Sequence, residues 1–109
     1  MSSYTPDKWT ILEITPEQGG TYYKVFGSWG GGYVDGDYWR VNSGIESVTQ
    51  DKDYFYFKGY SGSVYSCKKG YYGVVGASNR GVLDTFAKED TVQIMDYVVM
   101  ELMLEEKFL

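Results

Sequence analysis

Tyrosine side chains interleaved with lysine and arginine offer the richest chemistry in this chain. They occur in three segments, 22–24, 38–40 and 54–58, where they alternate with aromatic or aliphatic residues. Side chains two residues apart share a face in an extended chain, so one face of each segment carries rings and cations. The residues predicted to share the outward face are Tyr22, Lys24, Tyr38, Arg40, Tyr54, Tyr56 and Lys58. If the segments are neighbours in one sheet, these seven side chains form a candidate binding surface.

This candidate surface has three interpretations. Rings and cations together bind single-stranded nucleic acid, because bases stack on the rings and phosphates pair with the cations, at about 1–3 kcal/mol per stacked base. Tyrosine and arginine are also enriched at the energetic centres of protein–protein interfaces. The third interpretation is structural, since tyrosine favours strands and its ring half-covers a sheet while the hydroxyl contacts water. The sequence leaves all three open.

Catalytic and metal chemistry has little support in the residue types present. The chain has no histidine, the commonest acid, base and metal ligand at neutral pH. Its single cysteine, Cys67, has no histidine partner, and although Lys68 and Lys69 would lower its pKa modestly, the sequence favours a structural thiol. Asp51 and Asp53 fall in a predicted hairpin turn. We therefore expect no enzymatic activity, no cofactor and no metal site.

A glycine-rich segment, 30–37, could be a phosphate-binding loop. A P-loop, the glycine-rich phosphate site of many nucleotide-binding proteins, requires Lys and then Ser or Thr directly after its last glycine. This chain lacks that pair of residues. Asp35 and Asp37 could contact a cation, but a calcium loop requires further oxygen ligands. The segment is predicted to be a connecting loop.

Length and composition predict one soluble domain, 1–109. The chain has 109 residues, of which 43% are hydrophobic and 18% aromatic, enough apolar surface for one core. Its formal charge of −5 disfavours polyanions as partners. The longest apolar run, 98–104, is far shorter than the roughly 20 residues of a membrane span. With one cysteine and no pattern typical of a signal peptide, we expect a cytoplasmic protein with no membrane partner.

Alternating residues and turn signals predict a β-rich fold. The predicted strands are Trp9–Thr15, Thr21–Trp29, Tyr38–Asn42, Ile45–Thr49, Tyr54–Lys58 and Val64–Cys67, with a bend at Ser43-Gly44. The side chains predicted to fill the core are Trp39, Val41, Phe55 and Phe57. Short strands separated by frequent turns favour an α+β fold that is mainly antiparallel, namely a small SH3-like or Sm-like barrel over about 9–67.

The C-terminal part, about 71–109, is predicted to be irregular and then helical, with one helix over 77–88. Asp90 and Gln93 resemble a capping box, which favours a helix from 91 to about 107. The β-branched residues in 91–97 equally allow a strand followed by a shorter helix. Either way, the apolar residues of 98–104 exceed one narrow stripe. They lie in a groove of their own barrel or form an interface, and the candidates for an oligomer interface are Val98, Val99, Leu102 and Met103.

The segments YYKVFGSWGGGYVDGDYWRVNSGI and DYFYFKGYSGSVYSCKKGYYG resemble small uncharacterised proteins of tailed phages of the marine T4-like and cyanophage type. The resemblance covers about 22–73 and implies a role in the cytoplasm of an infected bacterium, with no known activity. At the level of the fold, Asp37 and Asn42 after a glycine loop are similar to a motif of Sm and Lsm RNA-binding proteins, with a spacing that differs by one residue. The second Sm motif is matched only by two-residue pairs, Lys58-Gly59 and Lys69-Gly70.

Two hypotheses of different classes follow. The first is a non-enzymatic, phage-type accessory module that self-associates and binds a protein partner through the tyrosine surface or the C-terminal helix. The alternative is an Sm-like protein that binds single-stranded RNA or DNA on that surface.

Overall fold

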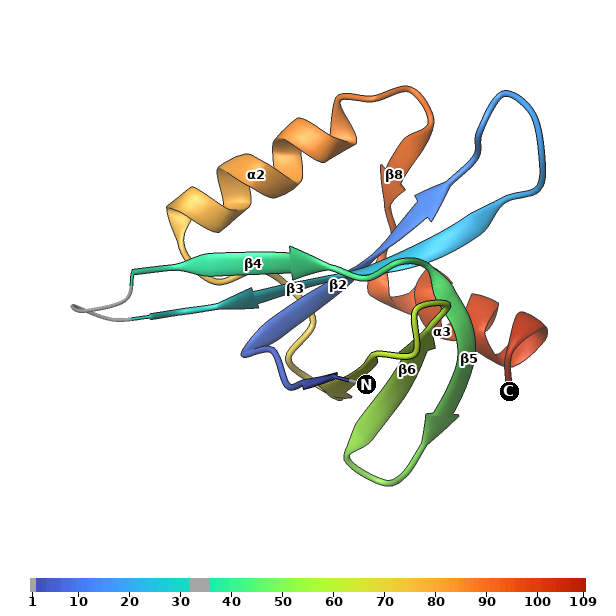
Figure 1. Cartoon of the computed structure of the whole chain (residues 1–109), viewed down its shortest axis with the longest axis horizontal. Coiled ribbons are helices and arrows are strands. Elements are labelled where there is room, and N and C mark those ends of the chain that lie inside the picture. The colour runs from blue at the N-terminus through green and yellow to red at the C-terminus, as the bar shows by residue number, and fades with distance from the viewer. Residues whose placement is uncertain (1, 32–35) are drawn as a thin grey trace.

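The computed structural model describes residues 2–31 and 36–109, and these residues form two four-stranded sheets and two helices (Figure 1). The elements are β1 (Ser3–Tyr4), β2 (Lys8–Ile14), β3 (Tyr22–Trp29), β4 (Tyr38–Val41), β5 (Ile45–Gln50), β6 (Tyr54–Gly59), β7 (Val64–Lys68), α2 (Ala77–Ala87), β8 (Val92–Ile94) and α3 (Tyr97–Lys107). Sheet A has the order β1-β7-β6-β5, and sheet B has the order β4-β3-β2-β8. The six strands predicted from the sequence are confirmed, each end lying within one residue of its prediction.

The predicted α+β class with mainly antiparallel strands is confirmed. Among the strands of the described chain, β1 runs parallel to β7 and the other neighbours are antiparallel. The predicted closed barrel is wrong: among the described strands the two sheets stay separate, because the edge strands β1 and β5 of sheet A make no ladder with the edge strands β4 and β8 of sheet B. The result is a pair of facing sheets open at both sides.

The chain passes from sheet B to sheet A at the predicted bend between β4 and β5. Asn42 organises this bend: its Oδ1 accepts hydrogen bonds from the Val25 amide at 2.9 Å and the Gly44 amide at 3.3 Å. The backbone N–H of Asn42 donates to the Val25 carbonyl at 3.1 Å. Gly44 has a φ of 128°, which side-chain-bearing residues rarely adopt. Asn42 belongs to the residue pair that is similar to an Sm motif. Its hydrogen bonds at the bend give it a structural role.

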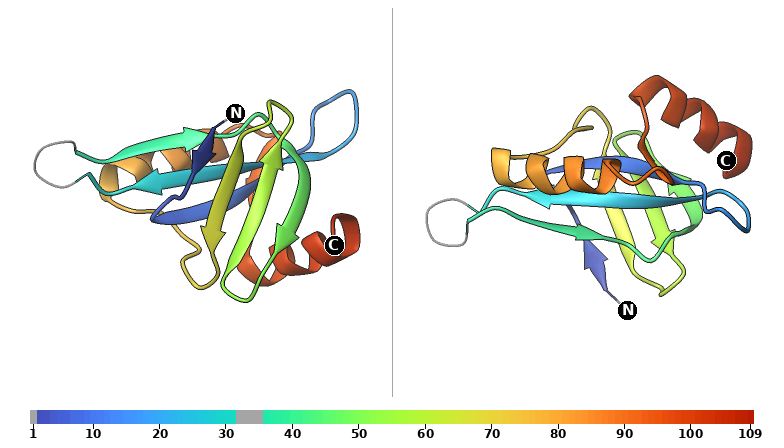
Figure 2. Two further views of the ribbon diagram at one scale, coloured as in Figure 1. Left: turned by 60° about the horizontal axis from the view of Figure 1, so that its bottom comes forward. Right: turned by 90° about the horizontal axis from the view of Figure 1, so that it is seen from above.

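The main core lies between the two sheets. Trp9 is fully buried, and its ring packs 5.5 Å from that of Phe57 and 5.9 Å from that of Phe55, between ring centroids. Phe55 and Phe57 are thus confirmed as core residues. From α3, Met100 and Leu104 enter the same cluster. Figure 2 shows α3 at the end of the sheets, next to β5.

A second, smaller core lies on the opposite face of sheet B, under α2. Leu12, Phe26 and Leu83 are its buried members. The prediction that Trp39 is buried is wrong, since 41% of its surface is exposed. Its ring stacks on Phe26 with centroids 5.8 Å apart and contacts Phe86 of α2 with centroids 5.5 Å apart, but β4 is an edge strand of sheet B, so no further strand flanks it. Val41, also predicted as core, is half-buried beside this cluster.

At the C-terminus the structure has the strand-then-helix alternative. Residues Val92–Ile94 form β8, which pairs with β2 through Leu12–Ile14. Helix α3 then begins at Tyr97, and the Asp96 carboxylate caps it by accepting from the Val98 amide at 3.1 Å. The predicted helix over 77–88 is confirmed as α2. In the described part of the chain, no helix is long and apolar enough to span a bilayer.

Candidate functional site

The seven predicted surface residues do not share one surface. Tyr22 and Lys24 lie on one face of sheet B. Tyr38 and Arg40 lie on the opposite face, because Arg40 pairs with Gly27, three residues along β3 from Lys24. The three on the outer face of sheet A are Tyr54, Tyr56 and Lys58. The register between β3 and β4 therefore separates the first two segments, and the passage from sheet B to sheet A separates the third.

Tyr38 and Arg40 cover the open side of the inter-sheet core. The Arg40 guanidinium carbon lies 4.5 Å from the centroid of the Tyr4 ring, so this cation contacts an aromatic ring of β1. The Tyr38 ring stacks on Trp29 with centroids 5.0 Å apart. Trp29 in turn donates its indole N–H to the Thr5 carbonyl at 3.0 Å. The Arg40–Tyr4 contact joins the edge strands of the two sheets, and the Trp29–Thr5 bond joins β3 to the link after β1, so these contacts have a structural role.

On the outer face of sheet A, Tyr54 and Tyr56 form a fixed pair of rings. Their centroids are 6.0 Å apart and their planes differ by 23°. The Tyr56 hydroxyl donates to the Asp51 carboxylate, which also accepts from the amides of Asp53 at 2.9 Å and Tyr54 at 2.8 Å. The bond from Tyr56, followed by those two amides, lowers the pKa of Asp51, and the same bond raises the pKa of Tyr56. Asp51 therefore holds the hairpin turn and the tyrosine ring in one arrangement.

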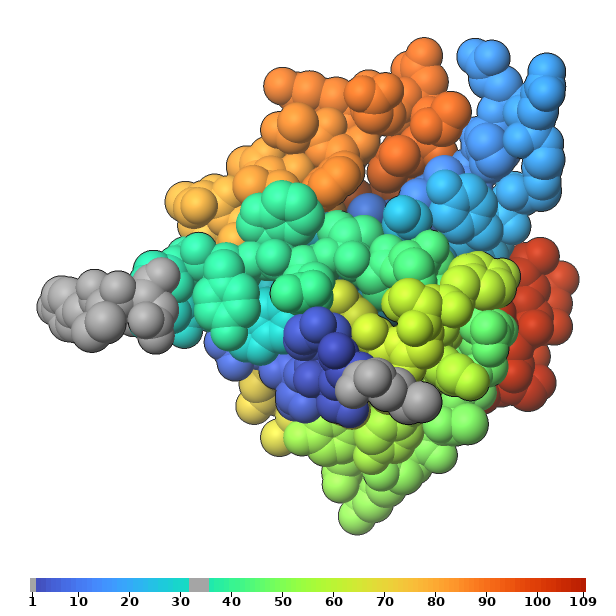
Figure 3. Space-filling view, viewed as in Figure 1, coloured from blue at the N-terminus to red at the C-terminus, as the bar shows by residue number. Residues whose placement is uncertain are grey.

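A hollow of about 490 Å³ adjoins this ring pair. The segment 5–8, which links β1 to β2, lines it together with Tyr54, and its remaining walls come from Lys68, Tyr71 and Val75. Figure 3 shows the N-terminal segment, in dark blue, lying against the yellow-green strands of sheet A. The hollow is thus formed where the chain leaves sheet A to enter sheet B.

A smaller hollow of about 220 Å³ shares two of these residues, Thr5 and Tyr54, and is completed by Tyr56 and Ser66. Since they have two lining residues in common, the two hollows adjoin. The two hollows on the outer face of β6 and β7 are here together termed the tyrosine groove.

The backbone hydrogen bonds of segment 5–8 hold one wall of the tyrosine groove. The Asp7 amide donates to the Ser28 carbonyl at 3.0 Å, and the Asp7 carboxylate accepts from the Gly30 amide at 2.9 Å. Pro6 packs against Gly27, where a side chain would bring a Cβ within 3.1 Å of the proline ring. The wall is therefore present before any ligand binds.

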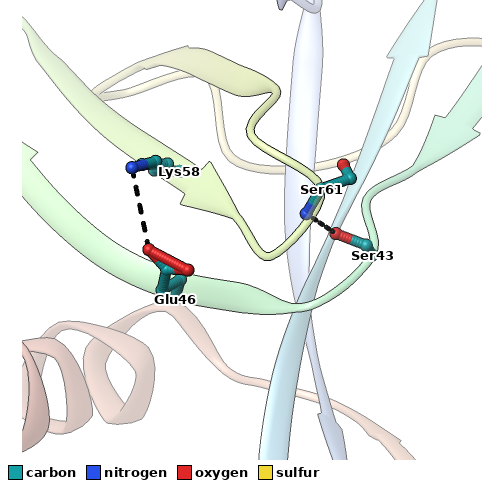
Figure 4. Close-up of polar contacts among 4 residues, drawn as sticks. All are labelled: Ser43, Glu46, Lys58 and Ser61. Carbon is teal, nitrogen blue, oxygen red and sulfur yellow. Dashed lines mark hydrogen bonds and ion pairs between the residues drawn. The ribbon is translucent and has the colours of Figure 1, made fainter. Parts of the chain in front are cut away.

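Cations are distributed unequally around the groove. Lys8 and Lys68 line it, and the Lys68 ammonium lies 5.0 Å from the centroid of the Tyr71 ring. Lys58, a predicted site residue, is not among the described lining residues of the groove, and its ammonium lies 3.7 Å from the Glu46 carboxylate. Figure 4 shows this ion pair together with the hydrogen bond from the Ser61 amide to the Ser43 hydroxyl. The groove thus offers aromatic surface with two cations in contact with it.

The predicted interface residues of α3 divide between surface and core. Val98, Val99 and Leu102 are exposed. Met103 is a correction: it is only 6% exposed and packs in the main core with Met100. Residues three apart share a side of a helix, so the side that carries Met100 and Met103 faces the sheets.

Other sequence candidates contribute little to a site. Cys67 is fully buried, and burial raises the pKa of its thiol well above the usual range, which suits a structural residue. Asp35 of the glycine-rich segment lies outside the described residues. Within 2–31 and 36–109, no three acidic or cysteine residues gather closely enough to hold a metal ion.

Sequence reasoning missed segment 5–8 and Tyr71. The available signal was Pro6, which removes a backbone donor and fixes an extended link shortly after the aromatic Tyr4.

Comparison with known proteins finds no matching family model, no similar curated protein and no similar solved structure.

Proposed function

We propose that this chain is a non-enzymatic accessory module that binds an extended segment of a protein partner in the tyrosine groove. The resemblance to small phage proteins adds the proposal that it acts in the cytoplasm of an infected bacterium. The single observation that carries the proposal is the groove itself, in which Tyr54, Tyr56 and Tyr71 line two hollows that share walls, beside a segment fixed by hydrogen bonds.

The groove has the properties of a preorganised peptide site. Tyrosine supplies a large contact area with few rotatable bonds, so its ordering on binding costs little entropy. Here the Tyr56 ring is already held by Asp51, and the Thr5 carbonyl is already bonded to Trp29. Holding a site in its bound geometry before binding increases affinity by reducing that ordering cost.

The lining residues indicate the chemistry of the partner segment. Lys8 and Lys68 favour an acidic residue in the partner, and the rings of Tyr54 and Tyr71 favour an aromatic or proline residue next to it. An acidic and aromatic segment would therefore suit the groove best.

Nucleic acid suits this surface less well. A phosphate chain needs a row of unpaired cations, whereas the described lining residues include two lysines, Lys8 and Lys68, and Lys58 on the same sheet face is near Glu46. The Asp51 carboxylate also accepts from Tyr56, which places a negative charge beside the ring on which a base would stack. These charges support a protein partner over a polyanion.

A displayed library of random peptides tests the proposal. Peptides selected on the folded chain are synthesised, and their affinities are measured by fluorescence anisotropy. We expect Tyr54→Ala to weaken binding about tenfold or more, as is usual for a central interface residue. The matched control is Tyr60→Ala, since Tyr60 is 64% exposed in the turn between β6 and β7 and is not among the described lining residues of the groove.

Two results would contradict the proposal. One is an equal loss of affinity in Tyr54→Ala and Tyr60→Ala, which would indicate nonspecific binding to exposed aromatic side chains. The other is saturable binding of short oligonucleotides that falls steeply with salt and is lost in Tyr54→Ala, which would assign the groove to nucleic acid.

A further inference from the structure

Helix α3 carries apolar side chains on its exposed side as well as on its buried side. Val98 and Leu102, one helical turn apart, are 61% and 63% exposed, and Val99 beside them is also exposed. The opposite side of the helix is anchored in the main core through Met100 and Leu104, which are fully buried. The exposed apolar row is therefore surplus to the packing of α3 against its own sheets.

Two carboxylates run parallel to this row. Glu101 and Glu105 are also one turn apart, and together with Val98 and Leu102 they line a hollow of about 200 Å³. We term these four residues the α3 face. The helix and its cap, 96–107, contain four carboxylates and one lysine, so the charge around the face is strongly negative.

We propose that the α3 face is a second interaction surface, separate from the tyrosine groove, and that it binds a basic amphipathic helix of a partner protein. Such a helix presents apolar residues at positions i and i+4, matching Val98 and Leu102. Lysine or arginine beside them would lie along Glu101 and Glu105, where opposite charges attract across the contact.

Charge distinguishes this occupant from a second copy of the chain. A two-fold symmetric contact brings the same patch of both copies together. Centred on Leu102, it would place Glu101 and Glu105 of each copy against the acidic helix of the other, and Lys107 is the one cation of 96–107 available to offset them. A basic helix buries the same apolar row and neutralises the carboxylates.

The test uses a synthetic helical peptide of about 18 residues, built from leucine and lysine with leucines on one side. Isothermal titration is expected to give saturable binding with one peptide per chain. We expect Leu102→Gln to weaken binding tenfold or more, and Glu101→Gln with Glu105→Gln to weaken it about fivefold. Leu102 is exposed, so its replacement leaves the core intact.

Glu17→Gln with Glu89→Gln is the matched control, because it removes the same charge from two other exposed positions. Unchanged binding in this control supports the proposal, and so does unchanged binding in Tyr54→Ala, which separates the α3 face from the groove. Equal binding of a scrambled leucine–lysine peptide, or equal weakening in the control, overturns it. A wild-type dimer in sedimentation that Leu102→Gln dissociates also overturns it, in favour of a second copy.

Discussion

The two faces of sheet A both carry aromatic side chains, but the inner rings are buried in the core and the outer rings line a groove. On the inner face, Phe55, Phe57 and Tyr65 are buried against the second sheet. On the outer face, Tyr54 and Tyr56 alternate with those phenylalanines in the same strand and line a groove. Alternation alone explains the inner set, because a half-buried strand must place every second residue in the core. Alternation leaves the outer set outside the core, on the face that we propose to bind a partner segment.

The two faces also differ in the surroundings of their tyrosine hydroxyl groups. Burial raises the pKa of Tyr65, on the inner face, to about 12. On the outer face the hydroxyl of Tyr56 donates to Asp51, a residue of the hairpin turn. Inner rings are thus held by packing, and outer rings by a local polar contact that leaves one side of the ring available.

The largest effect is expected from removing an inner ring. Phe57→Ala should lower the free energy of unfolding by about 3–5 kcal/mol, because it leaves a cavity against Trp9 in a fully buried site. Urea denaturation followed by tryptophan fluorescence measures the change. Tyr56→Ala, one position earlier and on the outer face, is the matched control, with an expected loss below about 1 kcal/mol. Similar losses in the two variants would remove the distinction between the faces.

A smaller loss is expected from a buried hydroxyl that the inner core requires. The Tyr72 hydroxyl accepts from the Ile11 amide at 3.0 Å and donates to the Met95 carbonyl at 2.7 Å. Tyr72→Phe keeps the ring but leaves both backbone groups without this partner, so we expect a loss of about 1–3 kcal/mol in the same assay. A neutral result would mean that these groups find other partners.

Alkaline pH should weaken the main core through two tyrosines that pack in it, Tyr65 and Tyr72. Burial raises the pKa of Tyr72, like that of Tyr65, to about 12, from an unfolded value of about 10. The neutral hydroxyls are therefore favoured by folding, and this contribution is complete below about pH 10 and lost as the pH rises through about 12. Absorbance titration of tyrosinate should show these two groups ionising together with unfolding. Ionisation near pH 10 in the folded chain would contradict their burial.

The smallest effect is expected on the outer face, at low pH. The hydrogen bond from Tyr56 lowers the pKa of Asp51, so the ionised carboxylate is favoured by folding above its unfolded value of about 4. This contribution is lost as the pH falls through the lower folded value. Asp51→Asn should therefore flatten part of the decrease in denaturation midpoint as the pH falls below about 4. An identical acid profile in the two proteins would refute the role given to Asp51.

The sequence predicted the strands well because their signals are local. Phe55 and Phe57 alternate with Tyr54 and Tyr56, and the glycine bend at Gly44 marks the change of direction. The division of the strands between two sheets depends on Asn42, whose bonds to Val25 join residues far apart in sequence. No local pattern encodes that pairing.

The groove was harder to predict for the same reason. Strand β1 has two residues, and it is defined by parallel pairing with β7, some sixty residues later. Once β1 is fixed, Thr5 and Lys8 come to line a hollow with Tyr54. The sequence identified two of the groove's tyrosines by type, but their neighbours are set by the long-range pairing.

The most direct test of a protein-binding groove is a map of amide shifts. A peptide selected on the chain is titrated into the ¹⁵N-labelled protein, and the shifts of each backbone amide are followed. We predict the largest shifts at the groove amides of Thr5, Lys8, Ser66, Lys68 and Tyr71, with those of α2 unchanged. Shifts centred on α2 or on the exposed Trp39, with the groove amides unmoved, would contradict the proposed site.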